Sequence, residues 1–122
     1  MNALAHSVIG AALEVHKKLG AGLDESLYRN AMCIELRKRG IAFVCEMLVD
    51  VLYDGHVIGQ RRMDLFVGGR LVVELKAVER LAPIHRAQVR TYLKITRTKL
   101  GLVINVNEIL LEDGIGRVVN ST

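Results

Sequence analysis

The chain has 122 residues, of which 51% are hydrophobic and 25% charged, and it contains a single proline. This composition excludes a disordered or low-complexity chain, and the length predicts one domain spanning residues 1–122. The net charge of +4 permits a polyanionic partner without requiring one.

Two helices are predicted in the N-terminal third. An apolar stripe with helical spacing covers residues 2–19, and Gly20 and Gly22 end it. A second helix is expected over residues 24–39, with Gly40 as its terminator. Its inward-facing positions are expected to be Leu27, Ala31, Ile34 and Leu36.

The hydrophobic period then changes to that of strands. Asp54-Gly55 predicts a hairpin turn, a Gly-Gly pair follows at residues 68–69, and Pro83 suits the first turn of a helix. The expected elements are strands at 43–53, 56–67, 70–78 and 100–106, a helix at 83–96, a helical turn at 107–111 and an edge strand at 117–120. The order α-α-β-β-β-α-β predicts an α/β (α+β mixed) fold, in which helices flank a central mixed sheet and the strand after the helix runs parallel to a neighbour.

Charged residues interrupt two of these strands, and the register of their hairpin decides whether they meet. A two-residue turn at the glycines would place Asp64 and Glu74 on opposite faces. However, the apolar residues Met63, Leu65 and Val67 stand at odd positions, as do those of the next strand. A single apolar face requires odd residues to pair with odd residues, and therefore a loop with an odd residue count or a bulge. That register places Asp64, Glu74 and Lys76 on one face, with Arg62 beside them.

Two carboxylates and an ammonium group on one face suit phosphodiester chemistry. Asp64 and Glu74, with the backbone carbonyl of Leu75, offer the oxygen ligands that Mg²⁺ or Mn²⁺ prefers. The metal would polarise a phosphodiester, and Lys76 would orient a water molecule or stabilise negative charge on the phosphate. The alternative for Glu74 and Lys76 is an ordinary exposed pair on a strand surface.

Several motifs in the chain together resemble a known family. Asp64 followed by ELK (residues 74–76) resembles the D…ExK signature of the PD-(D/E)XK nuclease superfamily, whose restriction-endonuclease-like core has the same element order. The segment QVRTY (residues 88–92) resembles the QxxxY motif of its RecB-like branch. The segment GLDESLY (residues 22–28) is similar to the name motif of the GxxExxY proteins, a family placed in that superfamily.

The resemblance implies a metal-dependent nuclease. It assigns metal binding to Asp64 and Glu74 and catalysis to Lys76, with Glu25 as a further acidic catalytic residue. Glu25, or else His16 on the first helix, would be an additional metal ligand. Gln88 and Tyr92, four residues apart on one helix face, would position the metal shell or a phosphate.

Each of these residues also has an ordinary structural interpretation. Glu25 could cap its helix from the N3 position if Gly22 is the N-cap. Tyr28 would pack with a satisfied hydroxyl, His16 would lie at the edge of the core, and Gln88 and Tyr92 would form the polar edge of a helix.

Basic residues surround the expected site in the sequence, and Arg62, Arg86 and Arg90 are candidate substrate-binding residues. Arg86 and Arg90 belong to a helical stripe that includes Lys94 and Arg97, which would follow a phosphate backbone or simply solubilise the helix. The expected partner is nucleic acid, with DNA as the first expectation, bound mainly through electrostatic contacts because aromatic residues are only 4%.

The sequence also bears on the cellular location, the oligomeric state and the competing functions of the protein. Two cysteines without CxxC spacing and the lack of a long apolar segment favour a cytoplasmic protein that neither contains a zinc site nor enters a membrane. A homodimer is expected because one compact site offers little surface for a duplex. The competing hypotheses are a catalytically weak or inactive nucleic-acid-binding module on the same fold, and an oligomeric scaffold that uses the first helix as its interface.

Overall fold

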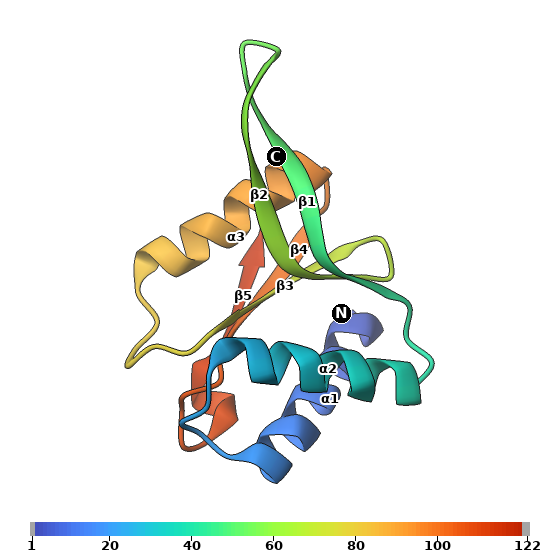
Figure 1. The fold of residues 1–122 in the computed structure, drawn as a ribbon, viewed down its shortest axis with the longest axis vertical. Helices are drawn as coiled ribbons and strands as arrows, with labels where there is room; N and C mark the ends of the chain where they lie inside the picture. The colour runs from blue at the N-terminus through green and yellow to red at the C-terminus, as the bar shows by residue number, and fades with distance from the viewer. Residues whose placement is uncertain (1, 121–122) are drawn as a thin grey trace.

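The computed structural model describes residues 2–120 and places helices on both faces of one sheet (Figure 1). The elements are α1 (Ala3–Leu19), α2 (Glu25–Lys38), β1 (Phe43–Tyr53), β2 (His56–Val67), β3 (Leu71–Lys76), α3 (Pro83–Thr96), β4 (Leu100–Asn105), the 3-10 helix η1 (Leu111–Gly114) and β5 (Ile115–Val119). Helices α1 and α2 cover one face of the sheet and α3 covers the other. The α+β mixed fold class expected from the sequence is confirmed, and the arrangement agrees with a restriction-endonuclease-like core.

The helix ends follow from local chemistry. The side chain of Asn2 accepts a hydrogen bond from the backbone N–H of Ala5 at 3.1 Å and caps α1, which Gly20 ends with a positive φ of 71°. Pro83 begins α3, and Arg97 ends it in the left-handed conformation.

The sheet has the order β1-β2-β3-β4-β5 and is mixed. Strands β3 and β4 are parallel, as the intervening helix predicted, and the other neighbours are antiparallel. The C-terminal elements differ from expectation. The helical turn forms at Leu111–Gly114 rather than at 107–111, because Leu111 is buried and anchors it to the core. Strand β5 consequently begins at Ile115, earlier than expected.

Two hydrophobic cores lie on the two faces of the sheet. The larger packs α1 and α2 against inward residues of β2, β3 and β4, and the smaller packs α3 against the opposite face. The apolar face of α1 is buried in the larger core, so it is not available as the oligomeric interface considered above.

Helix α2 faces the core with a different set of residues than its sequence indicated. Tyr28, Met32 and Leu36 are buried, whereas Leu27 and Ile34 are exposed. Both sets have spacings compatible with one helix face, and the choice is made by tertiary packing against α1 and the sheet rather than by hydrophobicity alone.

The outer part of the β1–β2 hairpin, residues 48–62, projects beyond the rest of the sheet and is called the hairpin arm (Figure 1). Most of its side chains are exposed, including Leu48, Leu52 and Ile58. Within residues 2–120, no helix has the length and apolar character needed to cross a membrane.

Candidate active site

The register that brings the acidic residues together is set by the loop between β2 and β3. Val67 pairs with Leu71 and Leu65 pairs with Val73, so the loop consists of residues 68–70. Three residues are an odd count, as the hydrophobic pattern required, and Gly68 and Gly69 supply the positive φ values of its turn. The parity argument from the sequence is therefore confirmed at this hairpin.

Strand β2 nevertheless changes faces just beyond the paired region. In the β1–β2 hairpin, Cys45 pairs with Leu65 and Met47 pairs with Met63. Glu46, which lies between Cys45 and Met47, has a φ of 54°. Leu65 packs in the core under α1 and α2, whereas Met63 packs in the core under α3. The expectation that Met63 shares an apolar face with Leu65 is therefore wrong. The left-handed backbone of Glu46 is an irregularity in β1 that interrupts its alternation of faces, and Met47 also packs under α3.

Asp64 and Glu74 lie where the paired part of β2 and β3 ends. The Glu74 carboxylate accepts a hydrogen bond from the backbone N–H of Asp64 at 2.7 Å. The Asp64 carboxylate accepts one in return from the backbone N–H of Leu75 at 2.8 Å. Both acids are buried, with exposed fractions of 8% and 5%. These side-chain bonds continue the connection between the strands beyond Leu65 and Val73, and they hold two carboxylates side by side.

Glu25 approaches this pair from the start of α2. Asp24 is the N-cap, so Glu25 is the first helical residue, and no side chain caps this end of the helix. The capping-box interpretation with Gly22 as N-cap is therefore wrong, because the helix begins two residues later than it requires. The Glu25 carboxylate instead lies within electrostatic range of Asp64 and Lys76.

The loop before α2 is fastened by Tyr28, as the packing interpretation of this residue expected. Its hydroxyl donates a hydrogen bond to the carbonyl of Gly20 and accepts one from the N–H of Leu23 at 3.3 Å. Gly22, within that loop, has a φ of 103°, which favours glycine. The glycine and the tyrosine of the GxxExxY segment thus shape the turn that delivers Glu25 to the site.

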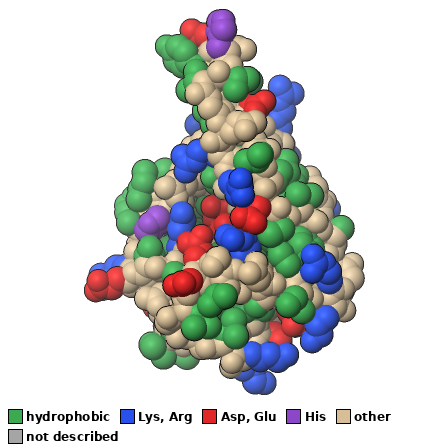
Figure 2. All heavy atoms as spheres, in the orientation of Figure 1, with side chains coloured by type: hydrophobic (Ala, Val, Ile, Leu, Met, Phe, Trp, Pro, Cys, Tyr) green, Lys and Arg blue, Asp and Glu red, His purple; other side chains and the backbone are tan. Residues whose placement is uncertain are grey.

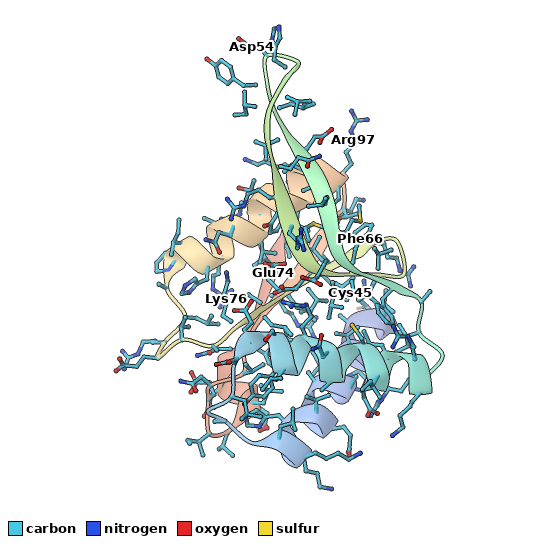
Figure 3. All side chains as sticks on the ribbon, viewed as in Figure 1. Cys45, Asp54, Phe66, Glu74, Lys76 and Arg97 are labelled. Atoms are coloured by element: carbon cyan, nitrogen blue, oxygen red, sulfur yellow. The ribbon has the colours of Figure 1, made fainter. Side chains whose placement is uncertain are left out.

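Lys76 is the last residue of β3, and a buried asparagine holds the backbone that follows it. The Asn105 side chain accepts a hydrogen bond from the N–H of Val78 at 3.1 Å and donates one to its carbonyl at 2.9 Å. The N–H of Val106 also bonds to the carbonyl of Lys76 at 2.8 Å. Because residues two apart on a strand share a face, Glu74 and Lys76 point into the same region, above the start of α2 (Figure 3).

Burial raises the pKa of three carboxyl groups, which we call the carboxylate cluster (Glu25, Asp64 and Glu74), and repulsion by neighbouring acids adds to the rise at Glu25 and Glu74. Burial, and next the charge of Asp64, raises the pKa of Glu74 to about 8. Burial also raises the pKa of Asp64, although the Leu75 N–H and the cations Arg29 and Lys76 oppose the rise. The pKa of Glu25 is raised by burial and by Asp64. Because these pKa values are raised, the carboxylate cluster resists full ionisation near neutral pH and favours the binding of a cation that offsets its charge.

Helix α3 contributes a second wall. Gln88 and Tyr92 lie together with Arg61 and Thr91 around a small cavity of about 60 Å³. The Tyr92 hydroxyl donates a hydrogen bond to the carbonyl of Arg62 at 3.4 Å. Burial, and next the nearby charge of Glu74, raises the pKa of Tyr92. The helical spacing of the QxxxY segment thus brings its two polar residues to β2, beside the carboxylate cluster.

Other candidate residues lie elsewhere or have structural partners. Arg86 donates to the carbonyl of Arg117 at 3.1 Å and packs over Gly116, so it is held against β5 and does not continue the expected basic stripe. Arg90 is exposed on α3. His85 accepts a hydrogen bond from the N–H of Ala82 at 2.9 Å, which caps the start of α3.

Two residues that sequence reasoning did not single out lie in the site. Arg29 from α2 places Nη1 3.5 Å from Oδ1 of Asp64 and Nη2 3.5 Å from Oε1 of Glu46. Arg62 also contacts Glu46, at 3.5 Å. Arg29 follows Glu25 by four residues on the same helix face, a spacing that could have identified it. Glu46 carried no such signal, since its backbone conformation is not visible in the strand pattern.

The donors present fit a hard divalent cation, although they do not form a complete protein cage. Among residues 2–120, no three His, Cys, Asp or Glu side chains lie close enough together to hold a metal ion. Neither Glu25 nor His16, a buried residue of α1, therefore completes a ligand set with Asp64 and Glu74 in this conformation. The fitting donors are the two adjacent carboxylates and the carbonyl of Leu75. This carbonyl points to the same side of β3 as the Leu75 N–H, which donates a hydrogen bond to Asp64. Mg²⁺ commonly binds through one or two carboxylates and retains water ligands.

Figure 2 shows the same region as a gathering of acidic side chains beneath the hairpin arm, with basic side chains around it. A family model described as the PD-(D/E)XK nuclease superfamily matches residues 2–118 of the chain. No curated protein and no solved structure gives a significant match.

Proposed function

Since the chain belongs to the PD-(D/E)XK nuclease superfamily, we propose that it hydrolyses phosphodiester bonds of nucleic acid with a divalent metal ion bound at Asp64 and Glu74. The observation that supports this most strongly is the pair of reciprocal hydrogen bonds that hold the two buried carboxylates beside each other. When bound, Mg²⁺ or Mn²⁺ would polarise the phosphodiester and acidify an attacking water molecule.

The chain's own residues would do the remaining work. Asp64 and Glu74 would bind the cation through carboxylate groups that backbone N–H groups hold in place, and the Leu75 carbonyl would add a neutral oxygen donor. Lys76 extends from the end of β3 with its backbone held, and its ammonium group stabilises negative charge on the phosphate. Glu25 supplies a further acidic group at the mouth of the site, which orients water. Gln88 and Tyr92 bound the side of the site formed by α3.

The substrate is proposed to be DNA, held through its phosphate backbone. A hollow of about 570 Å³ lies between the hairpin arm and the C-terminal half of α3, where Lys94 and Arg97 line it beside Asp50 and apolar residues. Lys94 and Arg97 suit contacts with phosphates, which hold a nucleic acid without reading its bases. Arg62 and Arg90, both exposed, are further candidates for phosphate contacts.

Cleavage assays with single-residue variants test this proposal. Purified protein is incubated with labelled single- and double-stranded DNA and RNA in Mg²⁺ or Mn²⁺, beside Asp64→Asn, Glu74→Gln and Lys76→Met. Loss of cleavage in all three variants, with retained folding, supports the assignment. Equal cleavage by the wild type and the variants contradicts it. Salt-dependent binding without cleavage in any divalent metal would instead identify a binding module on the same fold.

The finer assignments follow from the same proposal. We keep membership of the GxxExxY group, because its glycine and tyrosine shape the loop that presents Glu25. We also propose a cytoplasmic location and a homodimer. The exposed apolar residues of the hairpin arm supply a surface on which two copies could meet, and sedimentation analysis over a range of concentrations measures whether they do.

A further inference from the structure

Arg29 is a largely buried cation held between two carboxylates from different strands. Its side chain is 17% exposed, and its guanidinium lies 3.5 Å from Asp64 and 3.5 Å from Glu46. It enters from α2, one helical turn after Glu25. A fixed positive charge therefore lies directly against one of the two acids proposed to bind the metal.

The two oxygens of Asp64 have different partners. Oδ2 accepts the hydrogen bond from Leu75 N–H at 2.8 Å, and Oδ1 faces Nη1 of Arg29. Oδ1 is thus the oxygen left for a metal ion, and it is the one that Arg29 already contacts. Because a guanidinium and a divalent cation repel each other, the two compete for the same position on Asp64.

The pairing of Arg29 in this position is incomplete. Both contacts are 3.5 Å long, whereas good charge-assisted hydrogen bonds between arginine and carboxylate are about 2.7–2.9 Å. Its Nε is buried and has no hydrogen-bond partner among the described residues. A buried donor without a partner destabilises the arrangement that contains it. The guanidinium would gain by pairing with a single carboxylate through both Nε and Nη2.

Glu46 offers such a carboxylate. It lies at the irregularity in β1 and has a φ of 54°, a conformation that non-glycine residues rarely adopt and that often marks functional positions. Its side chain is 41% exposed, and Oε1 lies 3.5 Å from both Nη2 of Arg29 and Nη1 of Arg62. Glu46 is therefore already within reach of Arg29, outside the position that a metal would occupy.

We propose that Arg29 takes the place of the cation at Asp64 in the metal-free protein and moves onto Glu46 when a divalent metal binds, so that these two residues set the metal affinity. The inference rests on the proposed function only in taking Asp64 as a metal ligand. Arg29 and Glu46 act through Asp64 and are positioning residues.

Equilibrium Mn²⁺ binding near pH 8, measured by the electron paramagnetic resonance signal of free Mn²⁺, tests the competition without any substrate. Removing the competitor in Arg29→Met, which keeps an apolar stem, tightens Mn²⁺ binding by about three- to tenfold. Removing its alternative partner in Glu46→Gln weakens binding by about threefold. In the double variant the Glu46 change has little further effect, because no arginine remains to be moved.

Asp50→Asn is the matched control, because Asp50 lies on the same strand and bonds to Gln60 at 2.9 Å rather than to an arginine. It leaves the Mn²⁺ affinity unchanged. If the thermal transition shows that Arg29→Met does not fold, the comparison of Glu46→Gln with Asp50→Asn decides alone. Equal Mn²⁺ affinities of these two variants would overturn the inference.

Two further patterns separate this inference from the proposed function. Mn²⁺ binding by the wild type that is lost in Asp64→Asn, together with unchanged or weaker binding in Arg29→Met, overturns the role of Arg29 and leaves the metal site standing. A wild-type protein that binds no Mn²⁺, or an Asp64→Asn variant that binds it as the wild type does, overturns both.

Discussion

Replacing Glu74 with glutamine should stabilise the metal-free protein, and increasingly so as the pH rises. The pKa of Glu74 is raised from 4.5 to about 8 because the carboxyl is buried beside Asp64. The folded chain therefore binds the proton more tightly than the unfolded chain does. The resulting stabilisation is complete below about pH 4.5 and is lost as the pH rises through about 8. Glutamine has no proton to lose, and its carbonyl oxygen can still accept the Asp64 N–H.

The size of the effect follows from the pKa difference. Each unit is worth about 1.36 kcal/mol, so the interval from about pH 5 to about pH 8 has an upper limit of about 4 kcal/mol. The Asp64 N–H and Lys76 already lower the pKa from which this limit is worked, and we therefore expect the advantage of Glu74→Gln to grow by about 2–4 kcal/mol over this interval.

Urea denaturation in the presence of a chelator, repeated at several pH values, measures this difference in the free energy of unfolding. Glu79→Gln, which removes a charge from the exposed loop after β3, is the matched control and should show no such growth. An advantage of Glu74→Gln that does not change with pH, or a variant less stable than the wild type near pH 8, would refute the reasoning that Glu74 ionises at an energetic cost.

Further outcomes follow from other contacts. The Mn²⁺ affinity of the wild type should rise by up to about tenfold per pH unit below about pH 8, because the metal displaces a proton from the carboxylate cluster. Isothermal titration calorimetry at three pH values measures this affinity, and an affinity that does not change with pH would contradict the prediction. Tyr28→Phe should lose about 1 kcal/mol of stability, since the hydroxyl fastens the loop before α2. Tyr53→Phe, at the exposed hairpin tip, should lose none, and equal thermal transition temperatures for the two variants would contradict this prediction. Gly101→Ala should destabilise the fold by about 1–3 kcal/mol, because its new Cβ would meet Cγ1 of Val89 at 2.5 Å. Gly59→Ala, with open space around it, serves as the control, and urea midpoints that shift equally would argue against tight α3–β4 packing.

The hydrophobic pattern was sufficient to predict the pairing of the two acids. Odd-numbered apolar residues in β2 and β3 could share a face only if the loop held an odd number of residues, and the observed loop has three. The element order and the parallel β3–β4 pair were predictable for the same reason, since burial, turn residues and chain connection all favoured one topology.

The errors arose where tertiary packing overrides local pattern. Met63 reads as part of the apolar face of β2, but the unusual conformation of Glu46 turns the hairpin and moves Met63 under α3. Leu27 and Ile34 have helical spacing and yet are exposed, because α2 packs through Tyr28 and its neighbours instead. Backbone irregularities and the choice between two plausible helix faces are decided by contacts far apart in the sequence.

The candidate site was predictable in its strand residues and less so in its surroundings. Motif spacing identified the carboxylate cluster and Lys76, all of which lie within electrostatic range of one another. Arg86 was expected on a continuous basic stripe, but its contact with β5 depends on the position of the sheet edge. Asn105, which holds the backbone after Lys76, could not be distinguished from any other residue at a strand end.

Anomalous scattering from Mn²⁺ in crystals soaked near pH 8 tests most directly whether Asp64 and Glu74 hold a metal together. We expect a single strong peak in contact with both carboxylates and beside the carbonyl of Leu75, with the Arg29 guanidinium displaced toward Glu46. A peak elsewhere, or none at a concentration that saturates binding in solution, would contradict the proposed hydrolytic site.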